Sequence, residues 1–248
     1  MLKNKTAIIT GSNRGIGKSV LEVFSENNCN IIACVRNKTE EFEELCLTLE
    51  KKFNINITIY AFDFSNKIEI SEVANNIIKN HDKVEILVNN AGIIQTSLFQ
   101  MTKISSYEDI FNINFFNQLY FTQIIIKKLV KNKLGSIVFL SSSSAYEANI
   151  GRGAYSSTKS AIITVAKNLS IELARYNIRV NCVAPGLTLT DMMKESTPEK
   201  YLQDTIERIS LKRIADPREI SNTVLFLASE LSSYITGQTI RVDGGLNG

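Results

Sequence analysis

The sequence predicts an α/β fold: a parallel, doubly wound β-sheet of about seven strands with helices on both of its faces. Short runs rich in β-branched residues alternate with longer amphipathic segments along the 248-residue chain. Several of these runs, such as TAIIT at 6–10, are apolar almost throughout, which is typical of strands covered on both faces. Strand–helix alternation favours a parallel sheet with right-handed crossovers.

The predicted elements follow one another in order. Each strand is a short apolar or β-branched run: TAIIT (6–10), NIIACVR (30–36), NITIYAF (56–62), EILVN (85–89), SIVFLS (136–141), IRVNCVA (178–184) and QTIRV (238–242). Each helix is a longer segment of mixed polarity, at 15–27, 39–53, 67–80, 104–132, 153–175, 198–210 and 217–229. The three prolines stand at or before predicted helix starts, where proline is tolerated: Pro185, Pro198 and Pro217. No repeat, low-complexity linker or composition break marks a second domain, so residues 1–248 are predicted as one domain.

Composition and charge argue against several classes of function. Hydrophobic residues make up 44% and charged residues 21% of the chain, as in ordinary globular proteins. The formal charge of +3 is too small to indicate nucleic acid as the main partner. His81 is the only histidine, so a His-based triad or a multi-His metal site is not expected, and no metal is predicted.

The cysteines and the lengths of the apolar runs indicate in which cellular compartment the protein is expected. The four cysteines form no CxxC pair and are expected to be small core residues of a reduced compartment: Cys29, Cys34, Cys46 and Cys182. No run approaches the roughly 18–20 apolar residues that span a bilayer. A strand begins almost at residue 1, with no signal-like segment before it. The protein is therefore expected in the cytoplasm, with no membrane partner.

A glycine-rich turn, TGSNRGIGKSV, follows the first predicted strand and leads into a helix. Glycine lets the backbone turn tightly and approach a pyrophosphate, whose charge the N-terminus of the helix stabilises. Many strand–helix turns carry glycine for packing alone, but the position of this turn supplies the context that a dinucleotide site requires. The predicted cofactor-binding residues of the turn are Gly11, Ser12, Asn13, Arg14, Gly15, Ile16 and Gly17.

The end of the second strand indicates which cofactor is preferred. An acid at this place would accept the ribose 2′-hydroxyl of NAD, whereas an arginine suits a 2′-phosphate. The chain has Arg36 and Asn37 here, and Arg14 adds a second positive charge. NADP(H) is therefore predicted as the preferred cofactor, with NAD(H) as the other option. Asp63 and Phe64, after the third strand, are candidates to contact adenine; the alternative for Asp63 is an acid at a helix N-terminus.

Tyr155 and Lys159 form the candidate acid/base pair. Their spacing of four places both side chains on one face of a helix. A neighbouring ammonium favours phenolate, so Lys159 is expected to lower the pKa of Tyr155 toward neutrality. Taken alone, the pair is equally compatible with a solvated helix face.

The motifs together resemble the short-chain dehydrogenases/reductases. TGxxxGxG at 10–17, NNAG at 89–92, Asn114, serines at 141–144, YxxxK at 155–159 and PG at 185–186 follow that family's order and spacing over essentially the whole chain. The resemblance implies a single Rossmann-type domain with strand order 3-2-1-4-5-6-7 and a substrate lid at about 187–215. Within the family, the chain is most similar to 3-oxoacyl-(acyl-carrier-protein) reductases of fatty acid biosynthesis. It also implies a homotetramer or homodimer.

The resemblance implies roles for individual residues. Tyr155 would be the proton donor to a carbonyl, and Lys159 would lower its pKa and bind the nicotinamide ribose. Ser142 would polarise the substrate oxygen, and Asn114 would hold a water that links Lys159 to solvent. Further cofactor contacts would come from Asn90, Ala91, Gly92, Pro185, Gly186, Thr188 and Thr190.

Chemistry alone leaves several of these residues ambiguous. Any hydroxyl in the run 141–144 could aim at the substrate oxygen, and only the family spacing selects Ser142. The other serines could cap backbone groups at the strand end. NNAG could be a simple turn, and Asn114 a packing residue in a long helix.

Two places depart from the acyl-carrier-protein reductases, in which a basic pair near the active-site mouth docks the acidic carrier. One place holds Lys133, but the other holds Tyr176 where an arginine is usual. A carrier-bound substrate is thereby made less certain. Met192 and Met193 in the lid could contact an acyl chain or serve as general apolar cover.

Three functions remain open from the sequence. The first is an NADPH-dependent ketoreductase acting on a small carbonyl substrate, with a carrier-bound acyl thioester as one form of it. The second is an NAD(P)-dependent dehydrogenase of a sugar, polyol or other secondary alcohol, since nothing in the sequence sets the direction. The third is a catalytically silent NADP(H)-binding sensor, which could dispense with the Tyr155 and Lys159 that this chain keeps.

Overall fold

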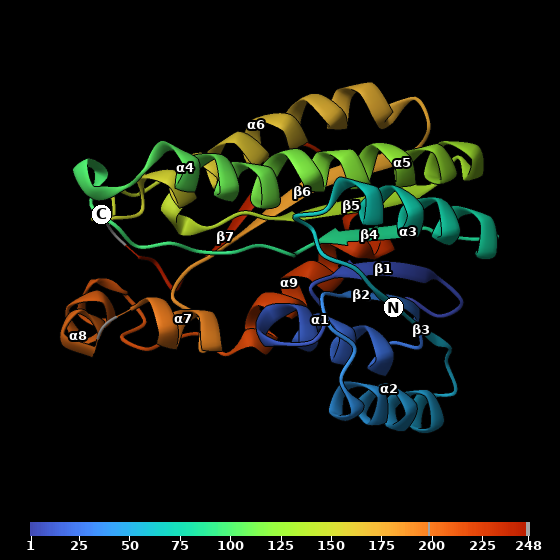
Figure 1. The fold of residues 1–248 in the computed structure, drawn as a ribbon. Coiled ribbons are helices and arrows are strands. Elements are labelled where there is room, and N and C mark those ends of the chain that lie inside the picture. Colours follow the sequence, from blue (N-terminus) through green and yellow to red (C-terminus); the bar gives the residue numbers. More distant parts are fainter. Residues whose placement is uncertain (198, 247–248) are drawn as a thin grey trace.

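Seven parallel strands form one sheet in the order β3-β2-β1-β4-β5-β6-β7, as predicted (Figure 1). The structure is a computed structural model that describes residues 1–197 and 199–246. The strands are β1 (Thr6–Thr10), β2 (Asn30–Val35), β3 (Ile57–Ala61), β4 (Ile86–Asn89), β5 (Gly135–Leu140), β6 (Ile178–Pro185) and β7 (Thr239–Val242). Each lies within about one residue of its predicted bounds. The order reverses between β1 and β4, which leaves a crevice at their carboxyl ends.

Helices cover both faces of the sheet, and two short ones lie beyond its carboxyl end (Figure 1). One face carries α1 (Gly15–Glu26), α2 (Glu40–Phe53) and α9 (Pro217–Ala228). The other carries α3 (Lys67–Asn80), α4 (Ile104–Phe111), α5 (Asn117–Asn132) and α6 (Gly153–Ala174). Beyond the sheet edge lie α7 (Asp191–Ser196) and α8 (Glu199–Arg208). None of the described helices is long and apolar enough to cross a membrane.

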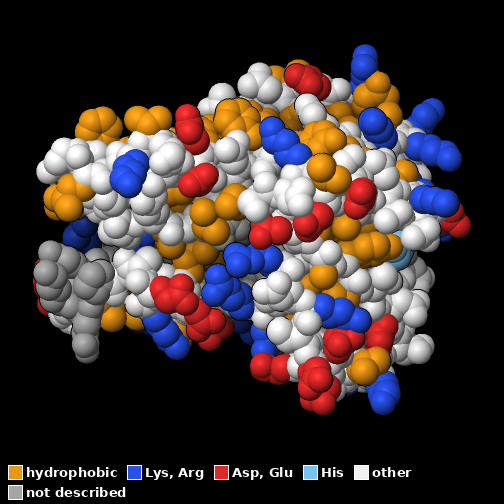
Figure 2. All heavy atoms as spheres, viewed as in Figure 1, with side chains coloured by type: hydrophobic (Ala, Val, Ile, Leu, Met, Phe, Trp, Pro, Cys, Tyr) orange, Lys and Arg blue, Asp and Glu red, His pale blue; other side chains and the backbone are white. Residues whose placement is uncertain are grey.

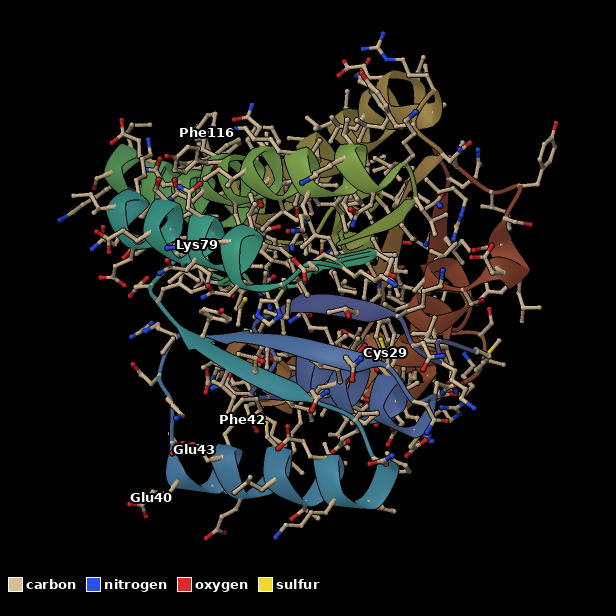
Figure 3. All side chains as sticks on the ribbon, turned by 90° about the vertical axis from the view of Figure 1, so that its right-hand side faces the viewer. Cys29, Glu40, Phe42, Glu43, Lys79 and Phe116 are labelled. Carbon is tan, nitrogen blue, oxygen red and sulfur yellow. The ribbon has the colours of Figure 1, made fainter. Side chains whose placement is uncertain are left out.

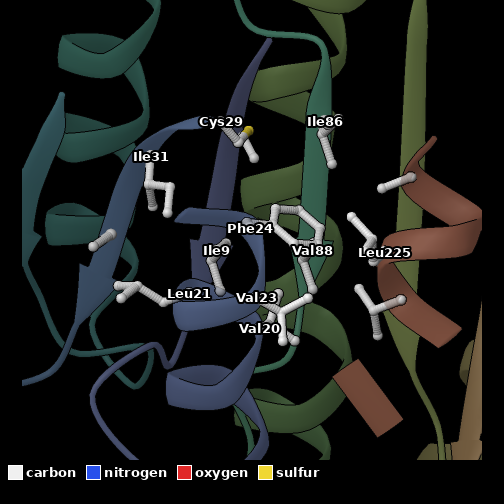
Figure 4. Close-up of a cluster of buried hydrophobic side chains, with 14 of the residues drawn as sticks. Ile9, Val20, Leu21, Val23, Phe24, Cys29, Ile31, Ile86, Val88 and Leu225 are labelled. Atoms are coloured by element: carbon white, nitrogen blue, oxygen red, sulfur yellow. The ribbon is translucent and has the colours of Figure 1, made fainter. Parts of the chain in front are cut away.

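The two helical layers explain why the strands are apolar throughout. In β1, Ile9 belongs to the core cluster under α1, whereas its neighbour Ile8 belongs to the cluster on the opposite face, and both are fully buried. Figure 4 shows Phe24 and Leu21 of α1 against the strands of the first cluster. Strict alternation of polar and apolar residues is therefore absent because neither face meets water.

The helix boundaries follow from local chemistry. The Thr39 hydroxyl accepts from the Phe42 amide and caps α2, whose first turn is acidic and whose last turn carries Lys51 and Lys52. Figure 3 shows Phe42 pointing toward the sheet and Glu40 away from it. The Asp216 and Glu219 side chains form a reciprocal capping box at the start of α9.

Two parts of the helical prediction differ from the structure. The segment 104–132 is helical throughout, as predicted, but a π-helical stretch that was not predicted, Asn112–Phe116, divides it into α4 and α5. Helix α7 was not predicted: it has six residues, too few to show a helical period, and it starts at the Thr190 cap. The helix predicted at 198–210 corresponds to α8; residue 198 itself lies outside the described residues.

Candidate active site

The carboxyl ends of the strands open into a cavity of about 910 Å³ that reaches from the glycine turn to Tyr155. Most of the predicted site residues line it: Gly11, Asn13, Arg14, Gly15, Ile16, Arg36, Asp63, Phe64, Asn90, Ala91, Gly92, Ser142, Tyr155, Lys159, Pro185, Gly186, Thr188 and Thr190. Four predicted residues are not among its lining residues: Ser12, Gly17, Asn37 and Asn114. The two halves of the predicted site, cofactor and acid/base, therefore share one cavity.

The glycine turn has the conformation that its sequence requires. Gly11 and Gly15 have φ angles of 67° and 53°, in the left-handed region that glycine adopts readily. Gly17 is instead required by close packing, since a Cβ there would lie 2.0 Å from the Gly11 carbonyl oxygen. It holds α1 against the turn without facing the cavity.

The N-terminus of α1 fits a phosphate group. Arg14 is the N-cap residue, its side chain makes no capping bond, and the first turn contains no acid. The Arg14 side chain therefore accepts no hydrogen bond from the N–H groups of this turn. These groups lie next to Asn13 and Gly15, which line the cavity. Free N–H groups at a helix N-terminus are a favourable site for a pyrophosphate. The residues present fit a dinucleotide cofactor.

Thr10 is a positioning residue that the sequence reasoning missed. Its hydroxyl accepts from the amides of Asn90 and Ala91, both at 3.0 Å, and donates to the Val88 carbonyl at 3.3 Å. The Asn90 side chain returns two bonds of 3.0 Å to the carbonyls of Thr10 and Gly11. These bonds join the ends of β1 and β4. The only available signal was a polar residue at the end of an apolar strand.

Two arginines lie at the cofactor end of the cavity. Arg36 is exposed and its Nε lies 3.6 Å from an Asp63 carboxyl oxygen. Arg14 lies 3.9 Å from Glu195 of α7. Figure 2 shows Lys and Arg side chains grouped over the space between α7 and α1. A hydrogen bond from the Ser65 amide, with the charge of Arg36, lowers the pKa of Asp63.

The structure brings Tyr155 and Lys159 together on α6. The Lys159 ammonium lies 5.6 Å from the centre of the Tyr155 ring and donates to the Leu140 carbonyl at 2.8 Å. A Cβ added at Gly92 would lie 3.7 Å from the same ammonium, so Lys159 is close to the NNAG turn. Tyr155 and Lys159, four positions apart, therefore lie on the same face of α6, as helix geometry predicts.

The predicted lowering of the Tyr155 pKa by Lys159 is wrong for this structure. Burial raises the pKa of Tyr155, and the opposing influences are a hydrogen bond with Ser142 and the charge of Arg152. Burial also lowers the pKa of Lys159 to about 8. The physical reason is that desolvation disfavours the charged form of both groups. The ammonium, moreover, is directed at a backbone carbonyl.

Hydrogen bonds distinguish the serines of the run 141–144. The Ser141 hydroxyl is occupied, because it donates to the Lys159 carbonyl at 2.8 Å. Ser142 accepts from the Ser144 amide at 3.1 Å and lines the cavity together with Tyr155. Ser144 accepts weakly from Asn149 at 3.5 Å. Of these serines, Ser142 is the one that lowers the pKa of Tyr155, against the larger effect of burial.

Asn114 lies in the π-helical stretch and is fully buried. Its side chain accepts from the Ile93 amide and donates to the Ile93 carbonyl, both at 2.8 Å. Its side-chain amide therefore fixes the loop after β4. π-Helical turns inside longer helices occur often at functional sites.

The lid region carries polar caps and apolar cover. Thr188 is buried and donates to the Gly186 carbonyl at 3.0 Å, while Thr190 caps α7 by accepting from the Met193 amide at 3.2 Å. Met192 and Met193 both line the cavity, and Met193 is buried.

The two places expected to dock a carrier do not lie at the mouth of this cavity. Lys133 precedes β5 and Tyr176 precedes β6, so both are at the amino ends of these strands, opposite Ser142. Tyr176 packs against the core, with the Arg175 guanidinium 4.8 Å from its ring. Within one chain, this pair is separated from the site by the length of the sheet.

Comparisons with known proteins agree with this geometry. A family model described as Enoyl-(Acyl carrier protein) reductase matches residues 11–247. The chain is 36% identical to the 3-oxoacyl-(acyl-carrier-protein) reductase FabG of Buchnera aphidicola subsp. Baizongia pistaciae, over 98% of this chain and 97% of that protein. It is 35% identical to the FabG of Thermotoga maritima, over 99% and 98% of the two chains.

A solved structure of 7α-hydroxysteroid dehydrogenase, complexed with NADH and 7-oxo glycochenodeoxycholic acid, is also similar. It has a TM-score of 0.90 and 29% sequence identity, and the match covers 99% of this chain and 97% of that one. The family match and the two relatives extend over nearly the whole chain. The chain, with its glycine turn and its Ser142–Tyr155–Lys159 group in one cavity, belongs to the short-chain dehydrogenase/reductase family.

Proposed function

We propose that the protein is an NADPH-dependent ketoreductase that reduces the 3-oxo group of acyl thioesters. The observation that carries this proposal is the meeting of Tyr155, Ser142 and Lys159 in the same cavity as the glycine turn. Relatives with about 35% identity over their full lengths are named 3-oxoacyl-(acyl-carrier-protein) reductases.

The cofactor, when bound, supplies the hydride that reaches the carbonyl carbon. The N-terminus of α1 would hold its pyrophosphate, and Arg36 and Arg14 would bind a 2′-phosphate. The Tyr155 hydroxyl donates its proton to the carbonyl oxygen as negative charge develops there. Ser142 accepts from the Ser144 amide, so its own hydrogen is available to Tyr155 or to the substrate oxygen.

Lys159 and Asn114 would return the proton to Tyr155. A pKa of about 8 lets the Lys159 ammonium both carry and release a proton near neutral pH. The side chain of Asn114 is occupied by Ile93, so the proposed water would be held by the Asn114 backbone carbonyl instead.

The substrate part of the cavity suits an acyl chain. Its lining includes apolar side chains from the loop after β4, the loop before α6 and the lid: Ile94, Leu98, Ile150, Met192 and Met193. We propose that residues 187–215 act as the lid, because α7 and α8 both contribute lining residues.

A dehydrogenase of secondary alcohols is the second candidate. The similarity to 7α-hydroxysteroid dehydrogenase favours it, since that enzyme acts on a hydroxyl group through the same fold. Lys133 and Tyr176 also lie away from the mouth of the cavity, so a substrate that is not bound to a carrier protein is compatible with the site. A catalytically silent NADP(H) sensor receives no support from a site in which every acid/base residue is present.

Turnover of NADPH with a substrate panel separates these functions. We expect oxidation of NADPH with short 3-oxoacyl thioesters, and none with keto sugars. A rate with steroid ketones or secondary alcohols alone would favour the dehydrogenase, and no rate with any member would favour the sensor.

Substitution Tyr155→Phe tests the role of the phenol. It removes the transferable proton and keeps the ring, so we expect turnover to fall at least about 10²-fold while NADPH affinity is retained. Steady-state kinetics and NADPH fluorescence titration measure the two quantities. Retained turnover would show that Tyr155 is not the proton donor.

Assembly and location are further parts of the proposal. We propose that copies pair through α4, α5 and α6, where exposed apolar side chains include Ile171 of α6 and Phe116 of the π-helical stretch between α4 and α5. A homodimer or homotetramer in the cytoplasm would agree with this. Light scattering of the purified protein gives the oligomeric state.

A further inference from the structure

Arg152 stands at the start of the catalytic helix and has no role in the sequence-based account. It is the N-cap residue of α6 and precedes Tyr155 by three positions, so the two side chains lie on one face of the first turn. Both line the same cavity, and Arg152 is half-buried. A partly buried cation needs partners, and those of Arg152 are unusual.

One end of the Arg152 guanidinium holds the lid. Its Nη2 donates to the carbonyl of Ser196, the last residue of α7, at 2.7 Å. The Thr96 hydroxyl donates to the same carbonyl at 3.4 Å. A cation is favourable at the C-terminal end of a helix, where carbonyl groups lack partners. Arg152 therefore connects α6 to the lid.

The other end of the guanidinium is buried and has no hydrogen-bond partner. This atom, Nη1, is one of the few buried side-chain nitrogens or oxygens in the described residues that have no hydrogen-bond partner. A buried donor without a partner is costly, so its retention calls for an explanation. Burial lowers the pKa of Arg152 and raises the pKa of Tyr155, and the interaction between the guanidinium and the phenol opposes both shifts.

Few other groups can compensate for the burial of Tyr155. On α6 itself, Lys159 is directed at the Leu140 carbonyl. Ser142 contributes a neutral hydrogen bond, and Cys182 of β6 has a pKa raised to about 12 by burial, which keeps it uncharged. From α4, the Tyr107 hydroxyl faces Gly153. The lid contributes Asp191, Asp204 and Arg208 to the cavity wall.

We propose that Arg152 is a positioning residue that stabilises the phenolate form of Tyr155 and is itself held in place by the lid carbonyl of Ser196. Closure of α7 over the cavity then sets both the position of the guanidinium and the acidity of the proton donor. This inference rests on the proposed function for its catalytic meaning. Its physical core, the electrostatic link between Arg152 and Tyr155, does not depend on the substrate.

Titration of Tyr155 in the free protein tests the link directly. The ultraviolet absorbance of phenolate is followed against pH, and the signal of Tyr155 is the difference from the Tyr155→Phe protein. Arg152→Gln should move the midpoint of this signal upward by about one pH unit, as expected for the loss of a neighbouring opposite charge. Arg152→Lys keeps the charge and should restore most of the shift.

Together with Arg152→Lys, a substitution at Thr96 separates charge from lid geometry. Thr96→Val removes the other bond to the Ser196 carbonyl without changing any charge, so the midpoint should stay in place. An unchanged midpoint in Arg152→Gln, or an equal rise in Arg152→Gln and Arg152→Lys, would overturn the proposal. If Arg152→Gln does not fold, as judged by circular dichroism, Arg152→Met provides the neutral variant. Because the titration needs no turnover, failure of the ketoreductase proposal would leave its outcome readable.

Discussion

Burial determines the behaviour of the acid/base residues more than their spacing does. Tyr155 and Lys159 meet on one helix face, yet the surroundings of each disfavour its charged form. The sequence could indicate the meeting, because helix geometry is local. It could not indicate the sign of the Tyr155 shift, because desolvation depends on which distant segments cover the side chain.

The buried Lys159 should make stability depend on pH. Its folded pKa of about 8 lies below the value of 10.5 for an unperturbed lysine, so between these values the unfolded chain binds more protons. The free energy of unfolding should therefore rise with pH in this window, by an amount on the order of 3 kcal/mol, and be flat below it. Urea denaturation of the wild type and of Lys159→Met, below pH 8 and near pH 10.5, measures the difference. A pH-independent difference between the two proteins would contradict a lowered pKa.

Arg36 should decide the choice between the two nicotinamide cofactors. Its side chain is exposed at the cavity, and its Nε lies 3.6 Å from the Asp63 carboxylate. Arg36→Ala should weaken NADPH at least about tenfold and leave NADH nearly unchanged, because a charge-assisted bond contributes about 1.5–3 kcal/mol. Fluorescence titration with each cofactor measures this. Lys38→Ala, which removes a charge paired with Glu43, is the matched control, and equal weakening of NADPH and NADH by Arg36→Ala would refute the 2′-phosphate role.

At the scale of elements, the packing of α1 against the turn after β1 requires that residue 17 has no Cβ atom. Alanine is ordinarily a better helix residue than glycine by about 1 kcal/mol, but a Cβ at Gly17 would overlap the Gly11 carbonyl. Gly17→Ala should therefore displace α1, lower the melting temperature by several degrees and abolish most cofactor affinity. Thermal melting and NADPH titration test both effects. Lys18→Ala, one position on, should change neither; a Gly17→Ala protein with full affinity would show that the turn tolerates the shift.

The interrupted helix shows where element-scale prediction stops. The segments on either side of Asn112–Phe116 were predicted as one helix because their polarity pattern is continuous. The π-helical turn places Asn114 against the backbone of Ile93, a contact made across the fold. The π-helical turn is accompanied by a contact between distant parts of the chain, and the periodicity of the sequence does not indicate such a contact.

On the scale of the whole molecule, Glu147 joins parts of the chain that are far apart. Its side chain is only 7% exposed, pairs with Arg241 of β7 and lies 3.9 Å from the Arg208 guanidinium of α8. Glu147→Gln should lower the free energy of unfolding by about 2 kcal/mol, less than for a wholly buried pair because Arg241 is partly exposed. The exposed pair of Glu26 and Arg218 is the control, since Glu26→Gln should cost about 0.5 kcal/mol or less. Denaturant unfolding compares them, and equal effects would mean that the Glu147 pair is no stronger than a surface one.

Much of the fold and of the site follows from the sequence alone. Strand positions, the parallel sheet, the glycine turn and the pairing of Tyr155 with Lys159 rest on local periodicity, backbone freedom and helix spacing, all of which neighbouring residues determine. The order of the strands was expected only from the family resemblance. The tertiary structure decided that the Ser141 hydroxyl is bonded to the Lys159 carbonyl and in which direction burial shifts the pKa of Tyr155. It also decided that Thr10 joins two strands and that Arg152 reaches the lid. These properties depend on desolvation and on contacts between residues far apart in the chain, and neither exists until the layers have packed.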